Sequence, residues 1–244
     1  MTCATDAYPG TFAGGDPEEL RALAEAAGRD LELAPAEEVL RWAAETFGSR
    51  FAVAGSMGAD TVLSHLASRV IPGVEVLFID TGYHFAETVG TRDAVDAVYD
   101  VRVRTVLPIL SVAQQDEKFG PRLYERDPDL CCAMRKVDPL NAVLGDYDAW
   151  ATGVRRDEAP TRANAPVVAF DAKRSKVKVS PLARWTQEDV DRYAQEHGTL
   201  VNPLVWDDYA SIGCAPCTRR VAAGEDARSG RWAGSAKTEC GINL

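Results

Sequence analysis

The sequence lacks a long apolar run: no stretch approaches the roughly eighteen apolar residues that a membrane-spanning helix needs. Residues 1–15 also lack the basic segment followed by an apolar one that marks a secretory signal. From these two absences we expect a soluble, cytoplasmic protein without a membrane partner.

Positive charge is also scarce. The chain has 27 lysines and arginines against 37 aspartates and glutamates, a formal net charge of -10. Such a surface repels the phosphate backbone of DNA and RNA unless the basic residues are segregated on one face. We therefore expect no nucleic-acid partner, while a small anionic substrate stays possible.

Two nucleotide-binding motifs are missing. The chain contains neither the GxxxxGK[ST] P-loop nor the GxGxxG fingerprint, which disfavours ATP hydrolysis and dinucleotide binding. Its 244 residues suit one α/β domain. We expect a flexible arm over residues 1–16, a domain over 17–227 and a C-terminal tail over 228–244.

Hydrophobic periodicity indicates a parallel sheet wrapped by helices. Short apolar runs typical of buried strands occupy residues 50–56, 74–79, 101–106 and 149–153. Helical patterns occupy residues 17–27, 35–47, 60–70, 85–98 and 186–197, and residues 167–170 and 177–179 suit a hairpin. In such sheets ligands bind outside the carboxyl ends of the strands.

Two turns follow predicted strands and could hold a nucleotide between them. In the first, glycine lets the backbone approach a phosphate, while a hydroxyl and the free N–H groups of the helix start face the anion. An ordinary capped turn is the alternative for these residues. The candidate binding residues are Ser56, Gly58 and Asp60 in the first turn and Asp80, Thr81 and Gly82 in the second.

Four of the six cysteines form two close pairs, Cys131 with Cys132 and Cys214 with Cys217. Four thiolates in two pairs are what a tetrahedral zinc or an iron–sulfur cluster requires. Adjacent cysteines reach two iron atoms of a cluster more easily than one zinc ion, which favours a 4Fe-4S cluster. Two disulfides are the remaining alternative, and a reducing cytosol opposes them.

A fifth cysteine, Cys240, lies near the C-terminus, and the sixth, Cys3, is expected to have no role. A leftover thiol near a terminus is more often inert than catalytic. Here, however, basic residues that include Arg228, Arg231 and Lys237 precede it, and cationic neighbours favour the nucleophilic thiolate. Glu239 opposes them.

Further cations gather in the loop after the fourth strand and behind the first cysteine pair. The loop carries Arg155, Arg156 and Arg162, and the pair is followed by Arg135 and Lys136. A solvated face is one interpretation. Arginines in a loop rich in Gly and Pro after a strand end are also typical of an anion clamp.

Five segments together resemble the assimilatory adenylyl-sulfate (APS) reductases. They are CCAMRKVDPL at 131–140, TGVRRDEAPTR at 152–162, GCAPCTR at 213–219, RSGRW at 228–232 and KTECGI at 237–242. The similarity runs from about residue 50 to the end. It implies the three-layer adenine nucleotide α-hydrolase-like fold of PP-loop type, with a mostly parallel sheet and a mobile tail.

The resemblance also implies a reaction. The Cys240 thiolate attacks the sulfonate sulfur of APS and displaces AMP, and a thioredoxin or glutaredoxin-like dithiol then releases sulfite. By the same resemblance Cys131, Cys132, Cys214 and Cys217 hold a 4Fe-4S cluster. Lys136, between cluster and substrate, would act electrostatically with Arg228, Arg231 and the loop arginines.

One position departs from the family, because Asn243 stands where the family tail usually has histidine. This puts in doubt only the pH dependence of the reaction. Three rival interpretations stay open: a reductase of the 3′-phosphorylated nucleotide (PAPS), a tRNA sulfur-transfer enzyme with an iron–sulfur cluster, and a zinc-stapled nucleotide-binding module without catalysis.

Overall fold

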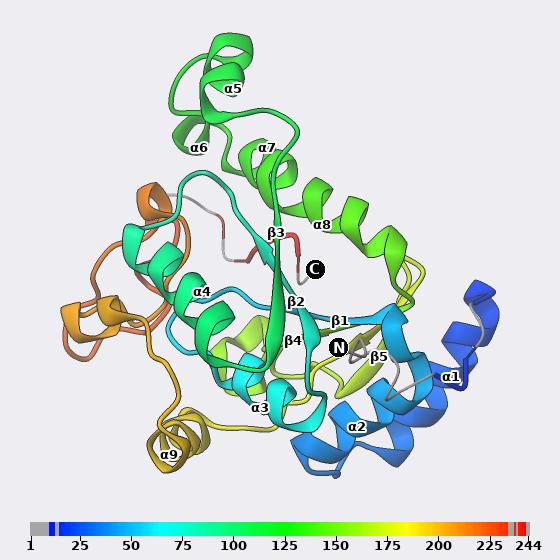
Figure 1. The fold of residues 1–244 in the computed structure, drawn as a ribbon. Helices are drawn as coiled ribbons and strands as arrows, with labels where there is room; N and C mark the ends of the chain where they lie inside the picture. Colours follow the sequence, from blue (N-terminus) through cyan, green and yellow to red (C-terminus); the bar gives the residue numbers. More distant parts are fainter. Residues whose placement is uncertain (1–9, 13–14, 234–236, 238, 243–244) are drawn as a thin grey trace.

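The computed structural model describes residues 10–12, 15–233, 237 and 239–242. Its centre is a six-stranded sheet in the order β3-β2-β1-β4-β6-β5, in which only β5 pairs in the antiparallel sense. Figure 1 shows this twisted sheet with helices on both sides. The strands are β1 (Phe51–Ala54), β2 (Val74–Ile79), β3 (Val101–Val106), β4 (Ala149–Thr152), β5 (Val168–Asp171) and β6 (Lys176–Val179).

Most helices begin at clear sequence signals. Asp16 caps the first one, with a proline at the first helical position, and Thr186 forms a capping box with Asp189 at the start of the last. The α-helices are α1 (Pro17–Asp30), α2 (Ala36–Phe47), α3 (Val62–Val70), α4 (Ala86–Val98), α5 (Val112–Phe119), α6 (Leu123–Arg126), α7 (Pro128–Cys132), α8 (Asp138–Val143) and α9 (Gln187–His197).

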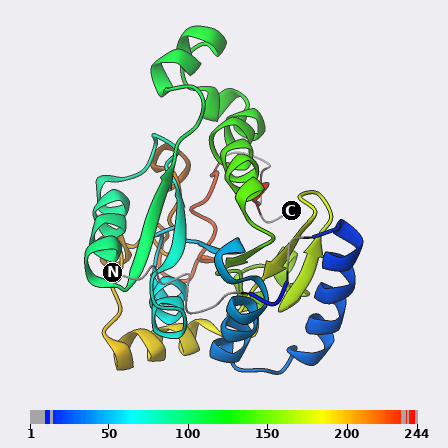
Figure 2. The same cartoon turned by 45° about the vertical axis from the view of Figure 1, so that its right-hand side comes forward.

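Alternation along the strands divides the core into two layers. Val53 and Val76 face the larger cluster, which also takes in buried residues of α1, α2 and α3. Ala52 and Trp150 face the smaller cluster, which includes Leu140 of α8. Because successive strand residues point to opposite faces, both faces of the sheet are covered, and Figure 2 shows the resulting three layers.

The predicted fold class is confirmed. The expected strands, helices and hairpin are all present, with bounds that differ by a few residues, as element ends usually do. Within the expected N-terminal arm, Thr11 and Phe12 donate backbone hydrogen bonds to the end of α2, and Phe12 packs on Phe47. Those residues are therefore attached to the domain.

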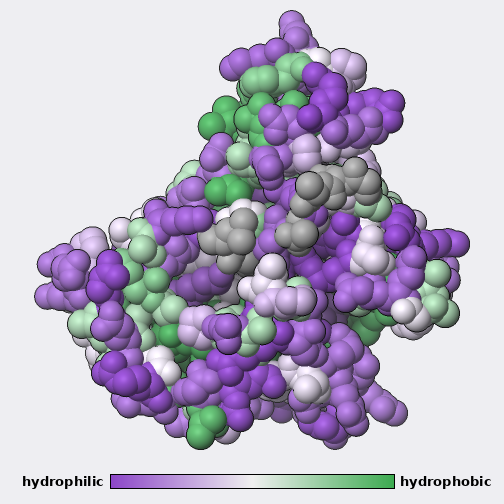
Figure 3. Space-filling model, turned by 180° about the vertical axis from the view of Figure 1, so that it is seen from behind, coloured by the Kyte–Doolittle hydropathy of each residue, from purple (hydrophilic) through white to green (hydrophobic). Residues whose placement is uncertain are grey.

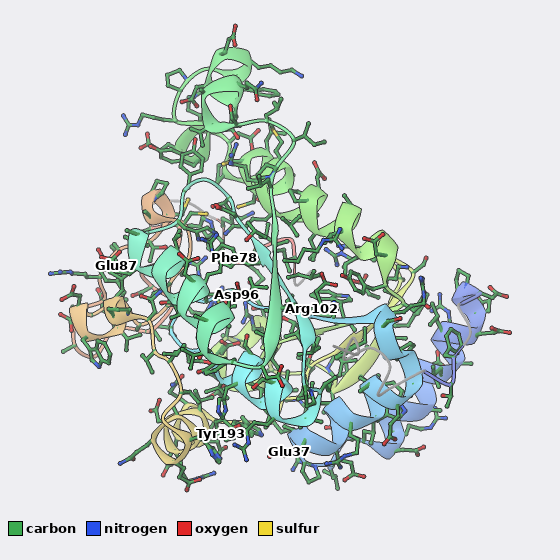
Figure 4. The ribbon with its side chains drawn as sticks, viewed as in Figure 1. Glu37, Phe78, Glu87, Asp96, Arg102 and Tyr193 are labelled. Carbon is green, nitrogen blue, oxygen red and sulfur yellow. The ribbon has the colours of Figure 1, made fainter. Side chains whose placement is uncertain are left out.

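The sequence did not predict the helical arm formed by α5, α6 and α7. Figure 1 shows it projecting above the sheet, and Figure 3 shows hydrophobic side chains gathering on it. Its helices are short and are interrupted at Gly120, Pro121 and Pro128, so no long apolar period marks them. Figure 4 places Tyr193 of α9 and Glu37 of α2 at the opposite end of the molecule.

A π-helical turn, Ala133–Val137, joins α7 to α8. It precedes Pro139, whose ring would collide with the carbonyl of Arg135 in a continuous α-helix. The turn changes the direction in which the side chains after the first cysteine pair point, and such turns are frequent at functional sites.

The order of the strands fixes where a ligand can bind. The chain builds β1, β2 and β3 outward in one direction and then returns to place β4 on the other side of β1. The connections that leave the carboxyl ends of β1 and β4 therefore diverge, and they leave a crevice at the edge where parallel sheets bind ligands. In the described part of the chain, no helix has both the length and the apolar character to traverse a membrane.

An ion pair between buried Asp148 and Arg50, whose side chain is 41% exposed, secures the start of β4. Asp148 accepts hydrogen bonds from Nε and Nη2 of Arg50, at 2.5 and 2.8 Å, and its side chain is 4% exposed. The neighbouring pair between Asp146 and Arg104 lies in solvent, with the two side chains 61% and 43% exposed.

We expect Asp148→Ala to destabilise the protein by about 1–3 kcal/mol, because it removes the buried carboxylate that accepts two hydrogen bonds from Arg50. The melting temperature should fall by about 2–10 °C in calorimetry at one scan rate. Asp146→Ala is the control and should cost less than about 0.5 kcal/mol, since exposed pairs contribute little. Equal losses in the two variants would contradict this assignment.

Candidate active site

A cleft of about 290 Å³ opens at the carboxyl ends of β1, β2 and β4. It lies where the diverging connections predict a ligand site, and the C-terminal tail forms part of its wall. The predicted site residues that line it are Ser56, Gly58, Asp60, Lys136, Arg155, Arg162, Arg228, Arg231 and Cys240.

The turn after β1 is held in an unusual conformation. Met57 has a φ of 49°, and its carbonyl accepts a hydrogen bond of 3.1 Å from the buried amide of Asn202. A Cβ at Gly58 would lie 3.3 Å from the carbonyl oxygen of Ile212, so the close approach favours glycine. Ser56 stays exposed at the cleft, where its hydroxyl is open to a ligand.

Asp60 serves the helix that follows. Its Oδ1 accepts a hydrogen bond of 3.0 Å from the backbone N–H of Val62, the first residue of α3. Burial raises the pKa of Asp60, and the Val62 N–H opposes that rise. Asp60 is thus both a cap and a residue of the cleft wall.

The structure does not bring Asp80, Thr81 and Gly82 to the cleft lining, although the sequence grouped them with the first turn. Asp80 accepts from the N–H of Gly82 and closes the turn, and the hydroxyl of buried Thr81 lies 3.3 Å from the sulfur of Cys214. The second turn therefore faces the cysteines.

The predicted arginines of the loop after β4 also differ in whether they line the cleft. Arg156 forms an ion pair with Glu32 at 2.7 Å and donates to the carbonyl of Ala165, outside the cleft lining. Arg155 lines the cleft but is buried and bound to Asp157 and Gln187. Sequence spacing alone does not tell which arginine of a loop turns inward.

Arg162 and Arg228 both reach Glu239 of the tail. Arg162 donates to both of its carboxylate oxygens, at 2.7 and 2.8 Å, and Arg228 donates to one of them at 3.3 Å. The sequence treated Glu239 as a charge that opposes the thiolate and assigned it no partner. The partner was hidden because Arg162 lies 77 residues away in the chain.

Arg231 and Lys136 differ from these arginines. Within the described ranges no carboxylate makes an ion pair with either of them. Arg231 donates to the hydroxyl of Ser211 and the carbonyl of Ile212, while its buried Nε has no hydrogen-bond partner. Burial and nearby Arg228 lower the pKa of Arg231. These two cations are the ones best able to receive an anion.

Lys136 lines two cavities at once. It borders the cleft and also a small void lined by Cys131, Cys132, Cys214 and Cys217. Burial alone would lower the pKa of Lys136, but the sulfur groups of Cys214, Cys240 and Cys132 outweigh burial and raise it. The ammonium group therefore stays charged between the cysteines and the cleft.

The four cysteines come together from α7 and a short 3-10 turn, Ala215–Cys217. Arg135 braces the α7 side, since it donates to the carbonyl of Thr81 and to the side chain of Gln115. Burial, and then the sulfurs of Cys214 and Cys217, raise the pKa of Cys131 to about 11. Thiols that disfavour one another's ionisation in this way become good ligands once a metal cation joins them.

The four cysteines have the chemistry of metal ligands, because thiolates bind both zinc and iron–sulfur clusters. In the described residues no group of three or more His, Cys, Asp and Glu side chains is arranged to hold one metal ion. The four cysteines nonetheless border one shared void, so their sulfurs approach one another closely enough to suit a common metal centre.

Cys240 lies in the cleft beside the first cysteine pair. Its thiol is hydrogen-bonded to Cys132, and this contact lowers the pKa of Cys240 and raises that of Cys132. Burial opposes the lowering, while Lys136 and Arg231 reinforce it. The residues brought together thus include a thiol with two cations, Lys136 and Arg231, close by. Cys3 and Asn243 lie outside the described residues.

The residues after Cys240 are also docked. Ile242 packs against the smaller core cluster, and the carbonyl of Gly241 accepts from Arg174 at 3.5 Å. In Figures 1 and 2 the red C-terminal segment lies beside α8. His84 and Trp232 also line the cleft and were not predicted as site residues; Trp232 ends the RSGRW segment, whereas His84 stands in no motif that the sequence singled out.

Known proteins resemble this chain over most of its length. The family model described as the phosphoadenosine phosphosulfate reductase domain matches residues 50–220. The adenosine 5'-phosphosulfate reductase of Streptomyces coelicolor is 66% identical over 93% of this chain and 95% of that protein. The protein of that name from Mycolicibacterium smegmatis is 57% identical, again over 93% and 95% of the two chains.

Solved structures agree on the fold. A phosphoadenylyl-sulfate (PAPS) reductase from Candida auris, in a phosphate complex, superposes with a TM-score of 0.68 at 26% identity, over 85% of this chain and 100% of that chain. An FMN adenylyltransferase from Candida glabrata gives a TM-score of 0.53 at 14% identity, over 89% and 72% of the two chains. The second likeness shows the fold alone.

We expect Arg231→Met to weaken the binding of AMP by about 10–100-fold, because a charge-assisted contact to a phosphate is worth about 1.5–3 kcal/mol. Isothermal titration calorimetry measures this directly. Arg156→Met is the matched control, since Arg156 is turned toward Glu32, and its affinity should stay within roughly two-fold of the parent. Equal weakening in both variants would show that the arginines outside the cleft act on the ligand as well.

Proposed function

The chain belongs to the phosphoadenosine phosphosulfate reductase domain family, and we propose that it reduces adenylyl sulfate to sulfite and AMP in sulfate assimilation. One observation carries the proposal: the thiol of Cys240 shares a cleft with Lys136 and Arg231, which have no carboxylate ion-pair partner among the described residues. A nucleophile and two available cations at a parallel sheet's carboxyl edge suit attack on an anionic nucleotide.

The substrate follows from the relatives. Those with 52–66% identity over more than nine-tenths of this chain carry the name adenosine 5'-phosphosulfate reductase. The protein named for the 3′-phosphorylated nucleotide is 26% identical. We therefore assign APS as the substrate and keep PAPS as the alternative that the experiment below distinguishes.

The first step is a displacement at sulfur. The thiolate of Cys240 attacks the sulfonate sulfur, the bond between that sulfur and the phosphate oxygen breaks, and AMP leaves with the bonding electron pair. Negative charge grows on the departing phosphate, and Lys136 and Arg231 would stabilise it there. The cysteine is left as an S-sulfo adduct.

The second step releases sulfite. A dithiol protein of the thioredoxin type attacks the Cys240 sulfur, sulfite departs with the electron pair of the sulfur–sulfur bond, and a mixed disulfide forms. The donor's second thiol then frees Cys240 and completes the donor's disulfide. The two electrons thus come from the donor's thiols and two protons are released, which suits a cytoplasm where such donors are kept reduced.

Cys131, Cys132, Cys214 and Cys217 would hold a 4Fe-4S cluster. Its chemistry at this place is electrostatic, because the thiols alone account for both electrons. The chain's own contribution is Lys136, which borders both the four cysteines and the cleft. Its ammonium group can therefore attract negative charge on the cluster and on the substrate. Arg135 and the π turn fix the ligand segment against the turn after β2.

We expect the anaerobically purified protein, incubated with 35S-labelled APS and no thiol, to retain label on Cys240. Mass spectrometry locates the adduct, and added reduced thioredoxin should release it as sulfite. Cys240→Ser should retain none, because the hydroxyl is a far weaker nucleophile at neutral pH. Label from PAPS but not from APS would change the substrate, and no label from either would overturn the reductase assignment.

The cluster has a separate test. Cys214→Ser should lose bound iron and the broad visible absorption of an iron–sulfur centre, because serine is a poor ligand for such a site. Cys240→Ser, which removes a thiol outside the ligand set, should keep both. Iron analysis and the visible spectrum decide, and a colourless parent protein that contains zinc would restore the zinc interpretation.

A further inference from the structure

Glu239 is the one acidic side chain in the sequence of the tail, residues 228–244. It is 4% exposed, and it accepts two hydrogen bonds from Arg162 and one from Arg228. Its Oε1 also accepts from the backbone N–H of Cys240 at 2.8 Å. Burial disfavours its ionised form, but Arg162 and the Cys240 N–H outweigh burial and lower the pKa of Glu239.

This pairing joins the tail to an element far away in the chain. Arg162 belongs to the loop after β4 and is also held by Glu158 at 2.5 Å, so the guanidinium group is fixed before the tail reaches it. A planar guanidinium bound through two parallel N–H groups fixes the orientation of its carboxylate as well as its position. A carboxylate held in this way determines where the next residue lies, and that residue is Cys240.

The other side of Cys240 is anchored differently. Ile242 packs on the smaller core cluster, and Arg174 contacts the Gly241 carbonyl. The thiol therefore sits between an ionic anchor and an apolar one. Of the two, only the ionic anchor uses cations that line the cleft.

The same pairing changes which cations are available to a ligand. Arg162 and Arg228 are satisfied by Glu239, whereas Lys136 and Arg231 make no carboxylate ion pair within the described ranges. Both of these cations also act on the Cys240 thiol. An anion that enters the cleft with the tail docked is therefore attracted toward the thiol.

We propose that Glu239 is a positioning residue for the reaction. By occupying Arg162 and Arg228 it holds the thiol of Cys240 in the cleft, and it leaves Lys136 and Arg231 to receive the substrate's anionic group beside that thiol. The consequence for turnover rests on the proposed function. The docking itself does not.

Glu239→Gln tests the docking because it keeps the size of the side chain and one acceptor oxygen but removes the charge. In the substrate-free holoenzyme, alkylation of Cys240 by iodoacetamide, followed by mass spectrometry, reports how often the tail opens. Rates are compared on the plateau of their pH profile, where the thiol is fully ionised, so that a shift in thiol pKa does not enter. We expect Cys240 in the variant to be alkylated at least about 10-fold faster, because the loss of one charge-assisted contact lets the tail open more often.

The same variant should transfer 35S from saturating APS to Cys240 about 10–100-fold more slowly in a single turnover, since the thiol spends less time in position. The Kd of AMP should stay within roughly three-fold of the parent. That split between rate and affinity separates positioning from a general loss of structure. Glu239→Asp, which retains the charge, should recover part of the transfer rate.

Glu225→Gln is the matched control, because Glu225 pairs with Arg219 in the same C-terminal region but outside the cleft lining. Glu225→Gln should leave the alkylation rate of Cys240, the rate of 35S transfer and the Kd of AMP unchanged. An unchanged alkylation plateau in Glu239→Gln overturns the proposal, and so does markedly tighter AMP binding, which would make Glu239 a competitor of the substrate. If the parent protein gains no label at all, the proposed function fails, while the alkylation rates still decide whether Glu239 docks the tail.

Discussion

A cation that is partly withdrawn from water needs negative partners, and Lys136 has them in sulfur. Its ammonium group lies between the void of the four cysteines and the cleft, where burial lowers the pKa of Lys136 and the nearby cysteine sulfurs, Cys214 and Cys240 above all, raise it by more. Desolvated charges persist only where such compensation exists. The π turn, the brace provided by Arg135 and the turn after β2 all serve to keep that arrangement together.

The strands and the ligand edge could be predicted because each depends on short-range pattern. Runs such as residues 50–56 and 74–79 carry the signature of buried strands, and parallel pairing then dictates which ends meet. The helices around Cys131 could not, because prolines and glycines divide them into pieces too short to show a period. The cysteine pairs were visible by spacing, although their shared void depends on the fold.

The long-range pairings were beyond the reach of the sequence. Nothing local distinguishes Arg156, which turns toward Glu32, from Arg162, which turns toward the tail. Likewise Thr81 looked like part of a nucleotide turn, and its hydroxyl instead lies beside Cys214. Which way a polar side chain turns is decided by partners that the fold brings from elsewhere, so motif spacing gave the candidates but not their grouping.

The fold is shared with proteins whose names describe other chemistry, such as the FMN adenylyltransferase at 14% identity. The sheet and its crevice are therefore a general scaffold, and function depends on what is added to it. Here the additions are the cysteine-bearing segments and the tail that carries Cys240.

The packing of Ile242 gives the tail a thermodynamic character of its own. Because that side chain adds to the cluster of Leu140 and Trp150, a tail that leaves the cleft also uncovers part of the hydrophobic core. Exposing a fully buried side chain of this size costs about 1.5–3 kcal/mol, so exposing the partly buried Ile242 costs less, and the exposure raises the heat capacity. Opening the tail is thus a small unfolding event, and its equilibrium constant should vary with temperature along a curve, as protein stability does.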